Sequence, residues 1–227
     1  MFIKKSKVVE EPLYDISSGD ASFELKEAYN ALCTNVLYAS NNEQLKKLAV
    51  TSSIYGEGKT SVAINLALAL ACNLIDKKVL LVDADLRTPH VAEFLKGKAM
   101  DFAKGQGLSD YLTGKSDFPS ASKTEISNLD VISAGDLILN PAGLLNSLKM
   151  KDFLDKCADL YDYVIIDTPP LNIVSDALLL IGKVDGYIVA AKTKVSKVPM
   201  LNAAQEALNS VGANVLGIVL TDSSKKK

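Results

Sequence analysis

Residues 53–60 constrain the fold of this chain most, because they place a glycine-containing loop between an apolar segment and a long helical one. The loop reads SIYGEGKT. The β-branched segment 48–52 precedes it, and the apolar run 61–75 follows it. A strand, a glycine loop and a helix in this order predict a phosphate-binding loop, in which backbone N–H groups surround a phosphate at the helix N-terminus. One position departs from the usual pattern, because Ser53 stands where such loops begin with glycine.

The loop predicts contacts for individual residues. Lys59 is expected to reach the β- and γ-phosphates of a nucleotide, and the Thr60 hydroxyl to ligate Mg²⁺. The candidate nucleotide-binding residues are Gly56, Glu57, Gly58, Lys59, Thr60 and Ser61. A Gly-Lys-Thr sequence also occurs in ordinary strand-to-helix turns, so this interpretation depends on further motifs.

Two acidic motifs supply that support. The apolar segment 79–82 leads into Asp83 and Asp85, and the apolar segment 163–166 leads into Asp167. Because side chains alternate along an extended chain, Asp83 and Asp85 are expected on one side of it. Ligands of an open α/β sheet bind outside the carboxyl ends of its strands. Each motif alone could be a helix-capping aspartate, but together with the loop they predict a nucleotide site.

The alternation of strand and helix patterns predicts an α/β fold: a doubly wound, mostly parallel sheet with helices on both faces. A single domain is expected over 21–220, between a mobile leader at 1–20 and a short polar tail at 221–227. Its first helix is expected at 21–39, with Ser22 as N-cap. We predict strands near 47–52, 78–83, 129–133, 162–167, 186–191 and 214–220. Further helices are predicted near 58–75, 89–96, 107–113, 141–159, 174–183 and 197–211, with a flexible loop at 97–107.

Composition limits the functional classes. The net charge of −2 gives no indication of a nucleic-acid surface. The three cysteines lack metal-binding spacing, as expected of a reduced cytoplasmic protein. The longest apolar run, 62–75, is too short to span a bilayer. We therefore expect a cytoplasmic protein whose membrane contact comes through a partner.

Most of the chain, residues 24–220, resembles the bacterial tyrosine kinases that regulate capsular and exopolysaccharide export. The matching segments are 27–35, 52–60, 82–89, 107–114, 140–145 and 164–170. The resemblance implies a P-loop ATPase fold related to MinD and ParA, with ATP and Mg²⁺ as cofactors and phosphoryl transfer to tyrosine. It makes Lys59 and Thr60 the Walker A residues, Asp83 and Asp85 the Walker A-prime residues, and Asp167 the Walker B residue.

The resemblance also implies partners. These are a membrane-anchored activator of the polysaccharide co-polymerase type, which would recruit the chain to the inner face of the membrane, a cognate tyrosine phosphatase and a homo-oligomer. Asn30 and Cys33 stand where many members carry arginines that pair across subunits, which weakens the oligomer expectation. The family's C-terminal cluster of acceptor tyrosines has no counterpart after Tyr187. Tyr14 in the leader is the candidate acceptor, although an ordinary leader residue is the favoured interpretation of it.

The expected chemistry needs charge neutralisation and a proton acceptor. Lys59, Asp83 and Asp85 are the candidate catalytic residues, while Thr60, Asp85 and Asp167 are the candidate metal ligands. Asp83 is the candidate general base for the tyrosine hydroxyl, although sequence leaves the roles of Asp83 and Asp85 exchangeable. Arg87 either reaches a phosphate or a subunit contact, or forms a surface salt bridge.

Two other functions compete with a kinase. ATPases of the MinD and ParA type use nucleotide hydrolysis to switch assembly, but their signature lysine position is Ile54 here. A regulator that binds ATP and phosphorylates little is the other. Because the chain carries the whole set of lysine, threonine and three aspartates, the sequence favours the kinase.

Overall fold

The computed structural model describes residues 7–9, 16, 21–39, 45–95, 106–119 and 121–222 of the 227-residue chain. Tyr14, most of the predicted loop at 97–107 and residues 223–227 lie outside the described residues. Within the predicted leader, residues 7–9 form a short strand and Ile16 is buried.

A single eight-stranded sheet forms the centre of the described structure, in the order β1-β8-β7-β2-β6-β3-β5-β4. The strands are β1 (Lys7–Val9), β2 (Lys47–Ser52), β3 (Val79–Asp83), β4 (Ser122–Lys123), β5 (Leu129–Ile132), β6 (Tyr163–Asp167), β7 (Gly186–Lys192) and β8 (Val215–Asp222). Every neighbouring pair is parallel except β4 with β5. The predicted mostly parallel sheet is therefore confirmed.

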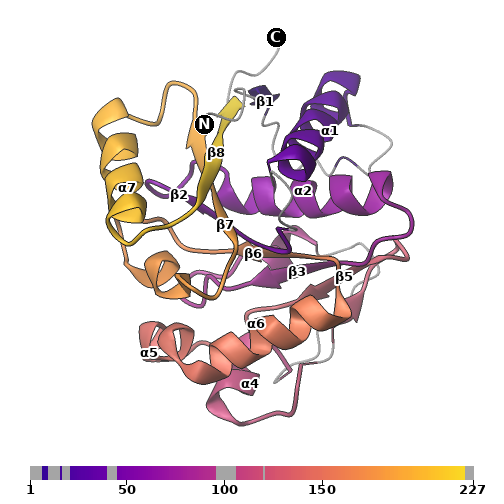
Figure 1. Cartoon of the computed structure of the whole chain (residues 1–227), viewed down its shortest axis with the longest axis vertical. Helices are drawn as coiled ribbons and strands as arrows, with labels where there is room; N and C mark the ends of the chain where they lie inside the picture. Colours follow the sequence, from indigo (N-terminus) through magenta and orange to yellow (C-terminus); the bar gives the residue numbers. More distant parts are fainter. Residues whose placement is uncertain are drawn as a thin grey trace.

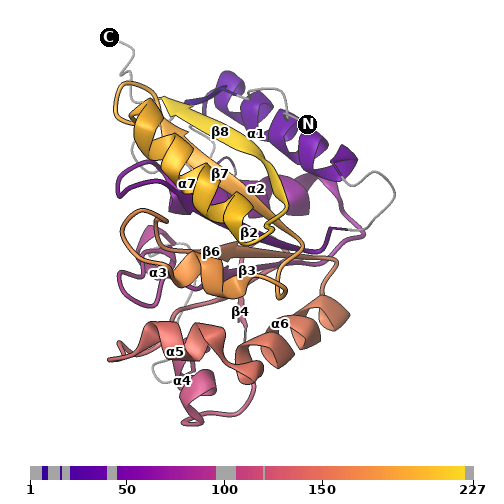
Figure 2. The same ribbon diagram turned by 60° about the vertical axis from the view of Figure 1, so that its left-hand side comes forward.

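Helices cover both faces of this sheet (Figure 1). They are α1 (Phe23–Tyr38), α2 (Lys59–Asn73), α3 (Val91–Phe94), α4 (Leu108–Thr113), α5 (Pro141–Asn146), α6 (Leu148–Leu160), the 3₁₀ helix η1 (Asp176–Leu180) and α7 (Val198–Ser210). In Figures 1 and 2, α1 and α2 lie on one side of the central strands, and α4, α5 and α6 lie on the other.

The alternation of side chains along β3 shows how one strand serves both faces. Val79 and Leu81 pack into the cluster that contains α1 and α2. Leu80 and Val82 pack into the cluster that contains α4 and α6. All four are buried, as expected for a parallel strand covered on both sides. The doubly wound class predicted from the sequence is thus confirmed.

Local predictions were wrong at two helices. The helix predicted at 141–159 is two helices, because Ser147 has an extended backbone and interrupts it. The Ser147 hydroxyl accepts a hydrogen bond from Met150 N and so begins α6. The helix predicted at 174–183 is only the short η1. The predicted cap at Ser22 is confirmed, since its hydroxyl accepts from Leu25 N at 3.2 Å.

Candidate active site

The loop between β2 and α2 has the backbone that a phosphate-binding loop needs. Gly56 and Gly58 have φ angles of 78° and 86°, which side-chain-bearing residues rarely adopt. Gly58 is the N-cap of α2, and no side chain caps this helix start. The first N–H groups of a helix lack intrahelical acceptors. The start of α2 therefore presents donors and the positive end of the helix dipole to an anion.

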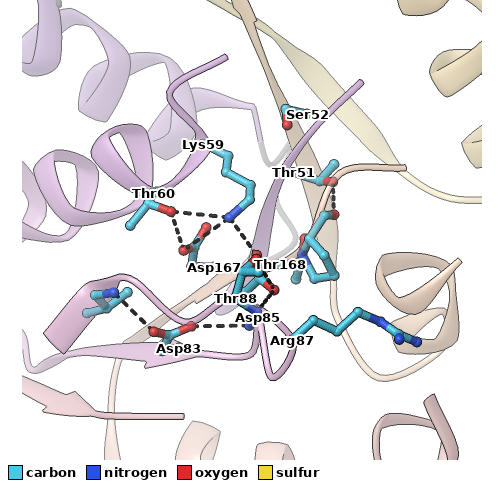
Figure 3. Close-up of polar contacts among 12 residues, drawn as sticks. Thr51, Ser52, Lys59, Thr60, Asp83, Asp85, Arg87, Thr88, Asp167 and Thr168 are labelled. Atoms are coloured by element: carbon cyan, nitrogen blue, oxygen red, sulfur yellow. Dashed lines mark hydrogen bonds and ion pairs between the residues drawn. The ribbon is translucent and has the colours of Figure 1, made fainter. Parts of the chain in front are cut away.

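The predicted acidic residues come together beside this loop (Figure 3). β3 and β6 are neighbours, and their register pairs Asp83 directly with Asp167. Lys59 Nζ lies 2.8 Å from Asp85 Oδ2 and 3.8 Å from Asp167 Oδ2. The Thr60 hydroxyl donates to Asp167 Oδ2 at 2.7 Å. The structure thus gathers all five predicted side chains into one cluster.

Burial gives this cluster unusual electrostatics. Asp83, Asp85 and Asp167 are fully buried, and Lys59 is 8% exposed. Burial raises the pKa of the Asp83 carboxyl well above its usual range, and the charge of Asp167 raises it further. Burial also raises the pKa of Asp167, although Lys59 and Thr60 oppose that shift. For Lys59 burial disfavours the charged form, but Asp167 and Asp85 outweigh it and the pKa of the ammonium is raised.

The cluster fits a divalent cation. Asp167 Oδ1 is buried without a hydrogen-bond partner, beside the Thr60 hydroxyl. The cluster holds three buried carboxylates and one ammonium, which is within ion-pair distance of Asp85 and Asp167, so a further cation would offset the charge that burial penalises. The described residues hold no group of three or more acidic, histidine or cysteine side chains arranged to bind a metal unaided. Mg²⁺ uses one or two protein carboxylates and completes its shell with water and phosphate oxygens, a requirement that Asp167 and the Thr60 hydroxyl can meet.

The two aspartates after β3 have different surroundings. Asp83 Oδ2 accepts from Val91 N at 3.0 Å, and its Oδ1 accepts from Asp85 N at 3.2 Å. Asp85 instead pairs with Lys59, and its Oδ1 accepts from Thr88 N at 3.1 Å. Asp85 therefore lies on the Lys59 side of the cluster, whereas Asp83 also holds the start of α3.

Arg87 belongs to a salt bridge in this structure. Its guanidinium donates to both carboxylate oxygens of Asp176, at 2.7 and 2.9 Å. In Figure 3 the Arg87 side chain points away from Lys59 and from the hydrogen bonds and ion pairs drawn around Lys59. Of the two interpretations of Arg87, the structure favours the salt bridge, and its partner Asp176 in η1 carried no recognisable signal in the sequence.

Glu57 is the loop residue whose placement the sequence did not foresee. Its side chain points into the protein, where it is fully buried and accepts hydrogen bonds from Ser53, Ile54 and Ser196. The predicted nucleotide contact of Glu57 therefore does not involve its side chain, which is committed to the protein interior. The contact with Ser196 spans 139 residues of sequence, and no motif spacing could have revealed it.

Comparisons with known proteins assign the chain to a family. A family model described as an AAA domain matches residues 45–211. The tyrosine-protein kinase CpsD of Streptococcus pneumoniae is 36% identical over 196 residues, which cover 86% of this chain and 83% of that protein. The chain belongs to the bacterial tyrosine-protein kinase family. The resemblance read from its motifs is thereby confirmed.

Solved structures agree with the assignment. The chimerical protein CapA2B2 superimposes with a TM-score of 0.88 at 27% identity, covering 99% of this chain and 95% of that one. The kinase domain of Escherichia coli tyrosine kinase ETK gives a TM-score of 0.84 at 26% identity, with coverages of 98% and 91%. MinD of Pyrococcus horikoshii, solved with Mg-ADP, gives 0.62 at 22% identity over 77% of this chain and 69% of that one. The MinD likeness shows a shared fold.

No helix in the described part of this kinase-family chain combines the length and apolar character needed to cross a bilayer.

Proposed function

We propose that this protein is an ATP- and Mg²⁺-dependent protein-tyrosine kinase that acts in capsular or exopolysaccharide synthesis. The observation that carries the proposal is the cluster of Lys59, Thr60, Asp85 and Asp167 beside the glycine loop. Phosphoryl transfer depends on positioning and on neutralising charge. This buried cluster contains the Lys59 ammonium group together with several carboxylate and hydroxyl oxygens that could bind a metal. Membership of the tyrosine-protein kinase family supports tyrosine as the acceptor.

Each residue has a role in this proposal. The loop N–H groups and Lys59 bind and orient the phosphates of ATP. Thr60 and Asp167 would hold Mg²⁺, with Asp85 contributing directly or through water. When bound, the metal withdraws charge from the phosphate oxygens during transfer.

Asp83 is the proposed general base. The acceptor oxygen forms a bond to the γ-phosphorus while the bond to the β-phosphate oxygen breaks, so ADP leaves and the hydroxyl proton goes to Asp83. A base acts best when its pKa lies near the working pH. Burial raises the pKa of the Asp83 carboxyl, and when ionised such a carboxylate is a stronger proton acceptor than an ordinary one.

We further propose that a membrane-anchored activator recruits the chain to the inner face of the membrane, that a cognate tyrosine phosphatase reverses its action, and that it assembles as a homo-oligomer. The family resemblance supports these partners. The structure bears on the oligomer at one position, because Asn30 binds Glu27 and Asn73 of its own chain. Any oligomer of this chain must accordingly use contacts other than arginine pairs at this position.

The activator is tested by incubating the purified chain with radiolabelled ATP and Mg²⁺, with and without the cytoplasmic segment of a candidate activator. We expect phosphotyrosine to increase when the segment is present. Equal phosphotyrosine in both reactions would contradict the activator. ATP hydrolysis without any phosphotyrosine would instead favour a regulatory ATPase of the MinD or ParA type.

A further inference from the structure

The buried carboxylate of Glu57 collects hydrogen bonds from the head of the phosphate loop. Ser53 N donates to Oε2 at 2.6 Å, and Ser53 Oγ lies 2.7 and 2.8 Å from the two carboxylate oxygens. Ile54 N donates to Oε2 at 2.9 Å. A buried carboxylate is costly unless donors satisfy it, and the loop head supplies three of them. The buried Glu57 side chain therefore joins the end of the loop to its beginning, at Ser53 and Ile54.

This closure explains why the loop tolerates a serine at its head. Ser53 replaces the glycine expected there, and its hydroxyl is used as a donor to Glu57. The N–H groups of Ser53 and Ile54 are also committed to the carboxylate. Gly56 and Gly58 then turn the chain so that it enters α2. The carboxylate thus holds one end of the loop while the two glycines shape the other.

A second set of contacts joins Glu57 to the opposite end of the chain. Ser196, in the connection between β7 and α7, donates its hydroxyl to Glu57 Oε1. Ser196 Oγ in turn accepts from Lys192 N at 2.6 Å, which fixes the hydroxyl at the end of β7. The buried Thr221 of β8 donates to the Glu57 carbonyl oxygen at 3.0 Å. The phosphate loop is therefore tied through one residue to the ends of two neighbouring strands.

We propose that Glu57 is a positioning residue, whose carboxylate holds the phosphate loop in its nucleotide-binding shape and makes that shape depend on Ser196 in the β7–α7 connection. A side chain that contacts no nucleotide atom would thus set nucleotide affinity. The position of the β7–α7 connection would affect nucleotide affinity, because a shift of Ser196 removes a hydrogen-bond donor from the buried Glu57 carboxylate. This inference rests on the proposed nucleotide site.

The test measures the Kd of a fluorescent ADP analogue for the full chain and four single variants, far below the unfolding temperature. We expect Ser196→Ala to weaken binding severalfold and Glu57→Gln to weaken it about tenfold or more, because hydrogen bonds to a charged group are strong and their loss leaves buried donors unpaired. Ser196→Thr keeps the hydroxyl and should bind like the wild type. Ser210→Ala, an exposed serine on α7, is the matched control.

The double variant Glu57→Gln/Ser196→Ala separates this role from a general loss of structure. Because Ser196 acts through Glu57, the double variant should bind no more weakly than Glu57→Gln alone. Additive losses, or a Ser196→Ala affinity equal to that of the wild type, would overturn the inference while leaving the proposed function in place. A wild-type chain that fails to bind the analogue would overturn both. If Glu57→Gln does not fold, the Ser196→Ala and Ser196→Thr pair decides the question.

Discussion

At the scale of single residues, the site is defined by the opposing charges of its buried carboxylates and its buried ammonium group. Three buried carboxylates face one buried ammonium, and the pKa values of Asp83 and Asp167 are raised because burial disfavours their charged forms. A cation bound between Thr60 and Asp167 would reverse that penalty. Asp167 Oδ1 is buried without a hydrogen-bond partner, which is the clearest indication that a further ligand binds at this position.

Asp167→Asn tests the metal role at this scale. We expect the Mg²⁺ concentration needed for half-maximal nucleotide binding to rise at least about tenfold, since an amide is a poorer ligand than a carboxylate. The exposed Asp152→Asn on α6 is the control and should leave the Mg²⁺ dependence unchanged. An identical Mg²⁺ titration for Asp167→Asn and the wild type would count against Asp167 as a metal ligand.

Sequence predicted which residues gather beside the glycine loop better than it predicted the residues that support that loop. Lys59, Thr60 and Asp167 lie in local motifs, because a strand end and a helix start are short stretches with recognisable chemistry. Ser196 contacts Glu57 and Asp176 contacts Arg87 because the path of the chain over the sheet brings distant segments together, so nothing near them in sequence marks them.

At the scale of elements, strands were easier to predict than helix ends. Six parallel strands are mainly apolar runs, and they were found near their observed positions. The very short β1 and β4 have no such run and were missed. The break between α5 and α6 was also missed, because a single serine within an amphipathic pattern can lie inside a helix or begin one.

Ser147→Ala tests that break. The Ser147 hydroxyl accepts from Met150 N at 3.1 Å at the start of α6, so its removal should lower the free energy of unfolding by about 1 kcal/mol. Urea denaturation followed by circular dichroism measures the change. Ser210→Ala, near the end of α7, should stay within about 0.5 kcal/mol of the wild type. Equal stability of Ser147→Ala and the wild type would contradict the capping role.

At the scale of the whole molecule, the nucleotide site joins parts of the sheet that are distant in sequence. The loop after β2 and the ends of β3 and β6 contribute side chains to it, and the connection after β7 contacts Glu57 of that loop. Ligand binding at such a junction should stabilise the fold as a unit, because the ligand binds the native state and not the unfolded one.

We expect Mg²⁺ and ATP at one hundred times Kd to raise the free energy of unfolding by about 2.7 kcal/mol, and the Tm by about 5 to 10 °C for a chain of this size. Differential scanning fluorimetry measures the shift, and Mg²⁺ without nucleotide is the control. No shift at saturating nucleotide would contradict a nucleotide site at this junction.

The most direct test of the central claim is phosphotyrosine formation by Lys59→Met. Lys59 pairs with Asp85 and stands at the start of α2, where the phosphates of ATP are expected. The purified wild type, Lys59→Met and the exposed Lys156→Met are incubated with radiolabelled ATP, Mg²⁺ and the activator segment, and phosphotyrosine is mapped by mass spectrometry. We predict phosphotyrosine with the wild type and Lys156→Met, and a loss of more than about a hundredfold with a folded Lys59→Met. Undiminished phosphotyrosine in Lys59→Met would contradict the assignment of this site.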